Sequence, residues 1–227
     1  MDKKRRAFGV SAAYPKKMLR QSYIRSFYFM FLSLISLLIS LYFFFTILPY
    51  NRVLSTFGFV TMIIGFLNFT KSRKKIFQGL AGVRAEQLTS DLLVRETNGI
   101  VVNGVIFDLN KGDTDHVYIG HTLAAIETKS GHGELVYLPK SRMILNGKLM
   151  YRNPLAQTRK NAQQLSKLSG KHAKPILVIT FMEGEPRELE GVIVTNLKHL
   201  PKVIKQLPVI LDEKEALIIF EKLNYAH

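Results

Sequence analysis

The chain has 227 residues, no cysteine and a formal net charge of +15. The lack of cysteine excludes disulfides and thiolate metal sites, and the six histidines show no zinc-binding spacing such as H-x-x-x-H. The sequence contains neither a G-x-x-x-x-G-K-[ST] phosphate loop nor a G-x-G-x-x-G dinucleotide fingerprint. Motifs of the P-loop, Rossmann and zinc-enzyme classes are therefore missing.

Two uncharged, apolar runs near the N-terminus predict membrane-spanning helices. The first covers residues 26–51 and exceeds the roughly 20 residues that a helix needs to cross a bilayer, and the second covers residues 53–70. The first run is too long for the core of a signal peptide, and a second run follows at once. A buried core hairpin is the alternative, but apolar residues occupy every face of both runs. We expect a transmembrane helical hairpin at residues 27–70.

Most of the positive charge flanks this hairpin. Residues 1–26 contain eight Lys and Arg and residues 71–75 contain four, whereas the connecting turn has only Arg52. Because Lys and Arg mark the cytoplasmic side of a membrane, both termini are expected in the cytoplasm. The hairpin is expected in the inner membrane, with its basic flanks against anionic headgroups. The expected divisions are a basic segment (1–26), the hairpin (27–70), a basic juxtamembrane linker (71–78) and a cytoplasmic domain (79–223).

The sequence after the linker predicts a domain in which helices and strands alternate. A helix at 79–96 has a core-facing stripe of Ala81, Ala85, Leu88 and Leu92. Another helix is expected to begin at Asn153-Pro154 and to end before Gly170, because Asn caps helices, Pro suits their first turn and Gly suits their end.

The remaining elements follow from apolar runs and turn residues. Strands are expected at 100–107, 114–119, 123–129, 134–138, 175–181 and 191–195, with a hairpin turn at Asn146-Gly147, a charged loop at 182–189, and closing helices at 197–206 and 212–223. The helix, three strands, helix, strand order predicts an α/β sandwich in which an antiparallel hairpin feeds a mixed sheet.

Three polar residues on the hairpin predicted at 114–119 and 123–129 form a candidate metal-binding site. Glu127 and Lys129 share one face of their strand, and the short link through residues 120–121 brings Asp115 alongside them. Two close carboxylates repel each other and invite a divalent cation, beside which a lysine can hold a water or a phosphate oxygen. This pattern is typical of a metal-assisted phosphodiesterase, and ordinary solvated hairpin residues are the alternative.

Basic residues are segregated in the second half of the domain. Between Leu135 and Met182 there are nine Lys and Arg and no acid, although residues 76–227 have a net charge of only +3. We expect this face to contact a phosphate backbone without reading bases; the alternative is a solvated surface. The nucleic-acid-binding residues expected here are Lys140, Arg142, Lys148, Arg152, Arg159, Lys160 and Lys167.

Four separate motifs over residues 79–170 resemble a NERD (nuclease-related) domain of the PD-(D/E)xK nuclease superfamily. They are Gly82-Val83-Arg84-Ala85-Glu86, Asp115-His116, Glu127-Thr128-Lys129 and Asn153-Pro154-Leu155-Ala156-Gln157. The resemblance implies a restriction-endonuclease-like αβββαβ core. Thr114 stands where the superfamily pattern has proline, a departure that NERD domains commonly share.

The resemblance also implies roles for these residues. Asp115, Glu127 and the carbonyl of Thr128 would hold Mg²⁺ or Mn²⁺, Lys129 would position the attacking water, and Glu86 and Gln157 would support the centre from two helices. The implied substrate is nucleic acid, DNA before RNA. Two alternatives stay open: a non-catalytic nucleic-acid- or protein-binding platform that retains the fold, and a membrane scaffold. Assembly into a homo-oligomer is also left open.

Overall fold

A computed structural model describes residues 7–8, scattered positions between 24 and 46, and residues 52–107, 113–138, 142–150 and 153–225. The chain divides into two compact units, Met1–Tyr14 with Gly82–His227, and Pro15–Ala81. The boundary falls inside α2 (Arg52–Glu96), a single helix of 45 residues. Residues 71–78, expected to be a linker, are therefore helical, and the helix expected at 79–96 is the last part of α2.

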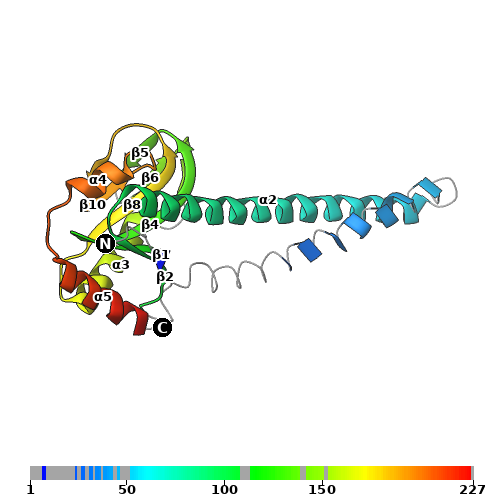
Figure 1. Ribbon diagram of the computed structural model, residues 1–227. Coiled ribbons are helices and arrows are strands. Elements are labelled where there is room, and N and C mark those ends of the chain that lie inside the picture. Colours follow the sequence, from blue (N-terminus) through cyan, green and yellow to red (C-terminus); the bar gives the residue numbers. More distant parts are fainter. Residues whose placement is uncertain are drawn as a thin grey trace. The chain divides into compact units, whose positions relative to one another are not determined.

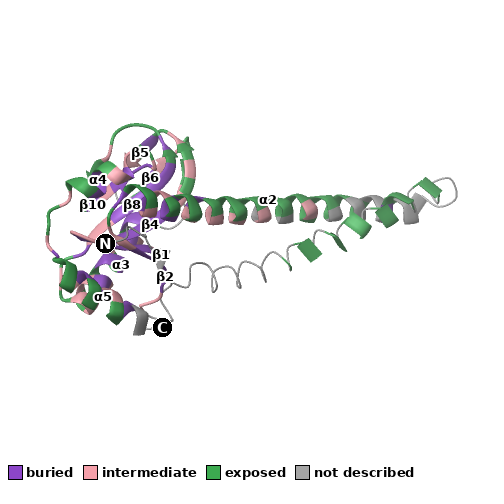
Figure 2. Cartoon of the chain, in the orientation of Figure 1, coloured by how far each residue is buried: buried purple, intermediate pink, exposed green. Residues whose placement is uncertain are grey.

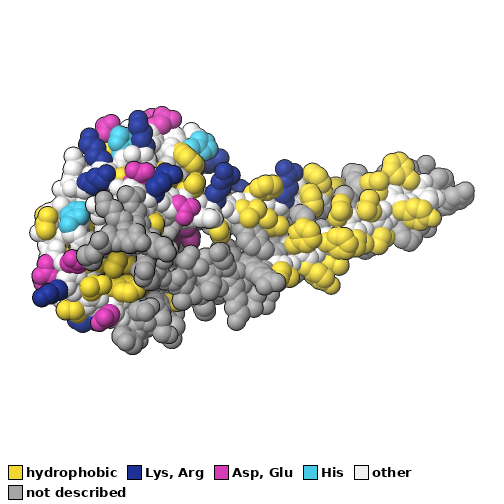
Figure 3. All heavy atoms as spheres, in the orientation of Figure 1, with side chains coloured by type: hydrophobic (Ala, Val, Ile, Leu, Met, Phe, Trp, Pro, Cys, Tyr) yellow, Lys and Arg dark blue, Asp and Glu magenta, His cyan; other side chains and the backbone are white. Residues whose placement is uncertain are grey.

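The N-terminal part of α2 presents apolar side chains to its surroundings. Val60, Ile63, Ile64, Phe66 and Leu67 are all exposed, and yellow apolar spheres cover much of this part of the helix in Figure 3. Within the described residues, however, no helix is both long enough and apolar enough to span a membrane. The hairpin predicted at 27–70 stays a prediction, and much of its first run lies outside the described residues.

A seven-stranded mixed sheet forms the centre of the larger unit, with the order β1-β2-β3-β4-β8-β10-β9 (Figure 1). Its strands are β1 (Ala7–Phe8), β2 (Ile100–Val105), β3 (Thr114–Ile119), β4 (Leu123–Gly133), β8 (Lys174–Met182), β9 (Arg187–Leu189) and β10 (Val192–Thr195). The β2, β3 and β4 strands are antiparallel, while β4, β8 and β10 run parallel. The mixed sheet predicted from the sequence is confirmed.

Two strands at the sheet edges were not expected. β1 comes from the basic N-terminal segment and pairs in parallel with β2, with Ala7 opposite Val101. β9 lies in the predicted charged loop and pairs with β10. Both are two or three residues long, so they are too short to produce a detectable period in the sequence.

Helices cover both faces of the sheet. On one face, α2 and α4 (Leu200–Gln206) supply Leu93, Leu200 and Ile204 to a cluster around Ile126 of β4. On the other face, α3 (Pro154–Ser169) and α5 (Glu213–Tyr225) pack on the strands, with Leu165 of α3 fully buried. Figure 2 shows the resulting purple, buried centre in the strands. The α/β sandwich is confirmed.

A small second sheet lies between β4 and α3 in the sequence. It has the order β5-β6-β7, formed by β5 (Leu135–Leu138), β6 (Arg142–Leu145) and β7 (Lys148–Leu149). The predicted Asn146-Gly147 turn joins β6 and β7, and both residues have positive φ angles, 48° and 71°, as a tight hairpin turn requires. Leu135 and Met143 pack with Leu155 of α3, so this sheet is fixed to the domain.

The α3 helix begins and ends where the sequence predicts. Asn153 Oδ1 accepts a hydrogen bond from the Ala156 N–H at 3.1 Å, Pro154 follows in the first turn, and Gly170 ends the helix with a φ of 72°. The buried stripe of α2 agrees with the predicted one at Ala85 and differs elsewhere, because Thr89 and Leu93 are buried while Leu88 is exposed. A polar residue therefore occupies the face that faces the sheet.

Candidate active site

The site lies where β3 and β4 separate. Their described register ends at His116 opposite Ile126, which places Asp115 beside Glu127. In place of a ladder bond, Asp115 Oδ2 accepts a hydrogen bond from the Thr128 N–H at 2.6 Å. A residue in an antiparallel pair uses its N–H and C=O toward the same neighbouring strand. The Thr128 carbonyl is therefore expected on the same edge of β4 as Asp115, and its role as an ion ligand stays a prediction.

Glu127 is the most buried charged group at the site. It is 1% exposed, and its Oε1 accepts a hydrogen bond from Lys129 Nζ at 2.5 Å in an ion pair. Its Oε2 accepts a hydrogen bond from Asn161 Nδ2 at 3.3 Å. Burying an unpaired carboxylate would cost several kcal/mol, so Lys129 and Asn161 make this position tolerable. The predicted same-face placement of Glu127 and Lys129 is confirmed.

Glu86 faces the same cluster from α2. Burial, followed by the negative charges of Asp115 and Asp113, raises the pKa of Glu86 to about 7, against a smaller lowering by Lys129. Glu86 therefore interacts electrostatically with Asp115, Asp113 and Lys129. The helix and the hairpin therefore bring Glu86, Asp115, Glu127 and Lys129 together, as the sequence motifs predict.

The cluster carries more negative charge than Lys129 alone balances. Burial, and then Glu127, raises the pKa of Asp115 well above its ordinary range, although Lys129 and the Thr128 N–H oppose this. Burial also raises the pKa of Glu127, against the opposing effect of Lys129. Burial lowers the pKa of Lys129, but Glu127 and Asp115 outweigh it and raise that pKa. The carboxylates therefore favour an additional cation.

The donor set fits a hard divalent ion. Asp115, Glu127 and the Thr128 carbonyl offer oxygen ligands only, which Mg²⁺ prefers while it keeps several waters. In the described part of the chain, no three His, Asp or Glu side chains form a metal-binding group by themselves. Two carboxylates and one carbonyl would thus be the protein's share of the coordination.

A buried polar chain supports the site from the α2 face of the sheet. His116 Nδ1 donates to Asn103 Oδ1 at 2.6 Å, and Asn103 Nδ2 donates to Ser90 Oγ at 3.0 Å. Ser90 lies one helical turn after Glu86, and His116 follows Asp115 directly. Nearby, Thr128 Oγ1 donates to Thr89 Oγ1 at 3.4 Å. These contacts connect α2 to both strands of the site.

Gln157 is not the α3 residue that contacts the cluster. That contact is made by Asn161, one turn further along the same face of the helix. Gln157 is partly buried, and its role stays a prediction. The sequence analysis gave Asn161 no role, although Asn161 follows Gln157 at the i, i+4 spacing that places two residues on one face of a helix.

The predicted nucleic-acid-binding residues differ in their environments. Arg142, Lys148, Lys160 and Lys167 are exposed. Arg159 instead forms an ion pair with Glu190 at 2.8 Å and donates to its backbone carbonyl at 3.1 Å. Lys140 and Arg152 lie outside the described residues. Lys160 and Lys167 are seven residues apart on α3 and therefore share one side of that helix.

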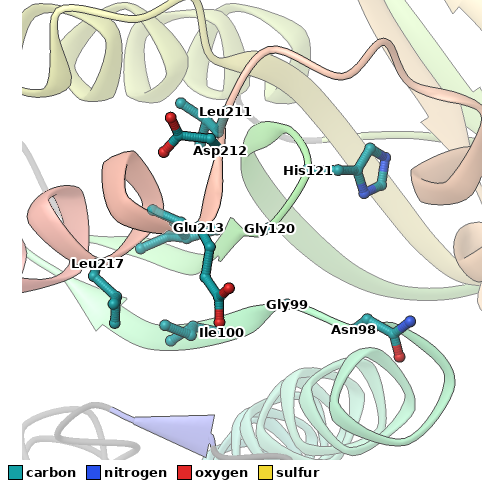
Figure 4. A pocket seen from close by; sticks show the side chains of 11 residues that line it. Asn98, Gly99, Ile100, Gly120, His121, Leu211, Asp212, Glu213 and Leu217 are labelled. Atoms are coloured by element: carbon teal, nitrogen blue, oxygen red, sulfur yellow. The ribbon is translucent and has the colours of Figure 1, made fainter.

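Two pockets of about 350 Å³ each lie elsewhere on the domain. One is at the opposite end of the β3–β4 hairpin, and its lining includes His121, Asp212 and Glu213 (Figure 4). Asp212 caps α5 by accepting from the Glu215 N–H at 2.8 Å, so it has a structural role. The other pocket has a basic lining that includes Arg159, Lys167 and Lys174. Neither pocket contains the carboxylate cluster.

Residues 81–196 match the family of the nuclease-related domain. This match covers α2 from Ala81 onward, the β2–β4 strands, α3, β8 and β10, and hence every residue of the carboxylate cluster. No curated protein and no solved structure gives a match.

The burial of His116 predicts a pH-dependent loss of stability. Burial lowers the pKa of His116 from 6.5 to about 3, so the unfolded chain binds a proton between these values that the folded chain does not. The contribution of neutral, buried His116 to the unfolding free energy is fully present above pH 6.5 and is lost as the pH falls toward 3. Between pH 8 and pH 5, we expect the wild-type protein to lose about 2 kcal/mol more unfolding free energy than His116→Gln.

Urea denaturation of both proteins at the two pH values measures this difference. The acids of the cluster contribute with the opposite sign, but their contribution is common to both proteins. His172→Gln, which changes an exposed histidine, is the matched control and should retain the wild-type pH dependence. If wild type and His116→Gln lose the same unfolding free energy between pH 8 and pH 5, His116 is not buried in its neutral form.

Proposed function

Because the chain belongs to the nuclease-related domain family, we propose that it is a membrane-anchored, Mg²⁺-dependent nuclease that hydrolyses nucleic acid phosphodiesters at the cytoplasmic face. The observation that carries the proposal is the convergence of Asp115, Glu127 and Lys129 where β3 and β4 separate. DNA is the first substrate to test.

Each residue has a distinct part in the proposed reaction. Asp115, Glu127 and the Thr128 carbonyl would hold the ion, which supplies an activated water and charge compensation at the phosphate. Lys129 is bound to Glu127 and remains partly exposed, so its ammonium can also contact a phosphate oxygen or the attacking water. Glu86, whose pKa is about 7, can exchange a proton near neutral pH. Asn161 orients Glu127.

A second candidate function is a non-catalytic binding platform. The specific observation in its favour is that both carboxylate oxygens of Glu127 already accept protein hydrogen bonds, from Lys129 and Asn161. On this hypothesis the ion pair is structural and the domain binds nucleic acid or protein without cleaving it. Metal titration separates the two functions.

The proposed membrane location rests on the chain's apolar runs and on the sheet topology. Residues 26–51 and 53–70 are uncharged, and the described side chains on α2 between Val60 and Leu67 include five exposed large hydrophobics. β1 and β2 belong to one sheet, which supports placing the chain before and after the apolar runs on the same side of a bilayer. The basic flanks support the cytoplasm as that side.

The first test concerns catalysis. Asp115→Ala and Glu127→Ala should abolish both Mn²⁺ binding and cleavage, because each removes an ion ligand. Lys129→Ala should retain Mn²⁺ binding yet lose roughly 100-fold or more in cleavage, because it removes charge stabilisation. Gln157→Ala should be milder, with roughly a 10-fold loss.

Calorimetric Mn²⁺ titration beside a cleavage assay on plasmid and single-stranded DNA and RNA provides the measurement. Cleavage that survives Asp115→Ala or Glu127→Ala would eliminate this site. A wild-type protein that binds nucleic acid but no metal would favour the platform.

The second test concerns the phosphate backbone. Replacing Lys160 and Lys167 by Gln should weaken binding to all sequences and reduce the slope of log K against log salt by about 2, one for each lost contact. Arg159→Gln should have a smaller effect, because Arg159 is engaged with Glu190. Lys222→Gln, on α5, is the control for a change of net charge. Filter binding at several salt concentrations measures the slopes, and an unchanged slope in the double variant would refute contact through this side of α3.

The third test concerns topology. Single cysteines introduced at Ser11, Tyr50 and Ser130 have no native cysteine to compete with them. An impermeant maleimide added to intact cells should label only position 50, and all three positions should react after lysis. Labelling of position 130 in intact cells would contradict a cytoplasmic domain.

A further inference from the structure

Phe181 is an exposed aromatic residue near the end of a central strand. Its exposure is 62%, whereas its neighbours in β8, Ile179, Thr180 and Met182, are at most 3% exposed. Core packing therefore does not explain the ring. A single exposed apolar side chain is unremarkable by itself, so its surroundings decide whether it has a role.

The surroundings of Phe181 connect it to the candidate active site. Lys129 on β4 is the register partner of Ile179 on β8, and Phe181 lies two residues further, about 7 Å along the strand. The β4 and β8 strands are parallel, so Phe181 lies beyond the cluster, toward their carboxyl ends. Ligands of open α/β sheets bind at these ends.

A second exposed ring lies beside Phe181. His132 is its register partner on β4, so the two backbones are about 4.8 Å apart. The pairing shifts between Lys129 and His132, which is an irregularity that redirects side chains at the end of β4. His132 is exposed and lies 3.3 Å from Asn146 Nδ2 through its Nε2 atom. The rings of His132 and Phe181 are thus exposed on neighbouring strands, directly after the irregularity.

The chemistry of this place matches an unpaired nucleobase. Every base has a π-face that stacks on an aromatic ring, whereas bases within a duplex are already stacked on each other. The ammonium of Lys129 and the exposed Lys148 provide positive charge for the adjacent backbone. A duplex offers phosphates to such cations, but it offers the rings no free base face.

We propose that Phe181, with His132, stacks an unpaired base next to the scissile phosphate, so that the substrate is single-stranded or has a frayed end. This inference rests on the proposed nuclease function, because it defines the substrate of that site. Phe181 contributes affinity for the strand and takes no part in the hydrolysis.

The test uses the full-length protein with EDTA present, so that binding is measured without cleavage. Fluorescence anisotropy compares a labelled single-stranded oligonucleotide with a blunt duplex of the same sequence. Phe181→Ala should weaken single-strand binding roughly 5- to 100-fold, the range for loss of one aromatic stacking partner, and should leave duplex binding nearly unchanged. Phe181→Tyr should restore single-strand binding.

A direct readout is available because the chain contains no tryptophan. Phe181→Trp introduces a single indole, whose fluorescence should be quenched by the single strand and not by the duplex. Phe77→Trp is the matched control, since Phe77 is 60% exposed but belongs to the other compact unit; its fluorescence should not change.

The outcomes separate this proposal from the function on which it rests. If the wild-type protein binds single strands and Phe181→Ala binds them equally well, or loses affinity equally for both forms, the stacking site is refuted while the nuclease function stands. If the wild-type protein binds neither form of nucleic acid, both proposals fail. If the Phe181→Trp signal does not respond to single strands that bind, the ring does not contact a base.

Discussion

The burial of one carboxylate, that of Glu127, is the constraint on which the site depends. A carboxylate that is 1% exposed is tolerable only with partners that hold it closely, since its desolvation costs several kcal/mol. Those partners come from two directions: Lys129 lies two residues along the same strand, and Asn161 lies on α3. The helix must therefore start in the right place, and the Asn153-Pro154 start fixes it there. Removing either partner would leave the charge undercompensated.

The parts of the site that could be predicted depend on local rules. Glu127 and Lys129 share a face because strand side chains alternate, and Asp115 adjoins them because a short link joins their strands. The limits of α3 follow from Asn153 and Gly170 for the same reason, because capping involves only neighbouring residues. Residues whose conformation is decided within one turn or one hairpin are accessible from sequence.

The parts that could not be predicted depend on distant contacts. The stripe of α2 was expected to include Leu88, which is exposed, whereas Thr89 is buried. The Thr89 hydroxyl accepts a hydrogen bond from Thr128 of β4 and donates one to the Ala85 carbonyl at 2.9 Å. Asn161 acquires its role only because β4 places Glu127 beneath it. The engagement of Arg159 by Glu190 likewise needs the fold. Apolar periodicity does not identify polar residues that are buried by partners far along the chain.

The pairing of β1 with β2 has a practical consequence for work on the isolated domain. Ala7 and Phe8 cover the edge of β2, yet they precede the two apolar runs, whereas β2 follows them. A chain shortened to start near Gly82 would keep the carboxylate cluster and lose this cover. Its sheet would end in the bare backbone of Ile100–Val105, a strand rich in valine. Open edges of this kind pair with other chains, so such a fragment would tend to associate through β2, and restoring a short N-terminal strand would suppress that association.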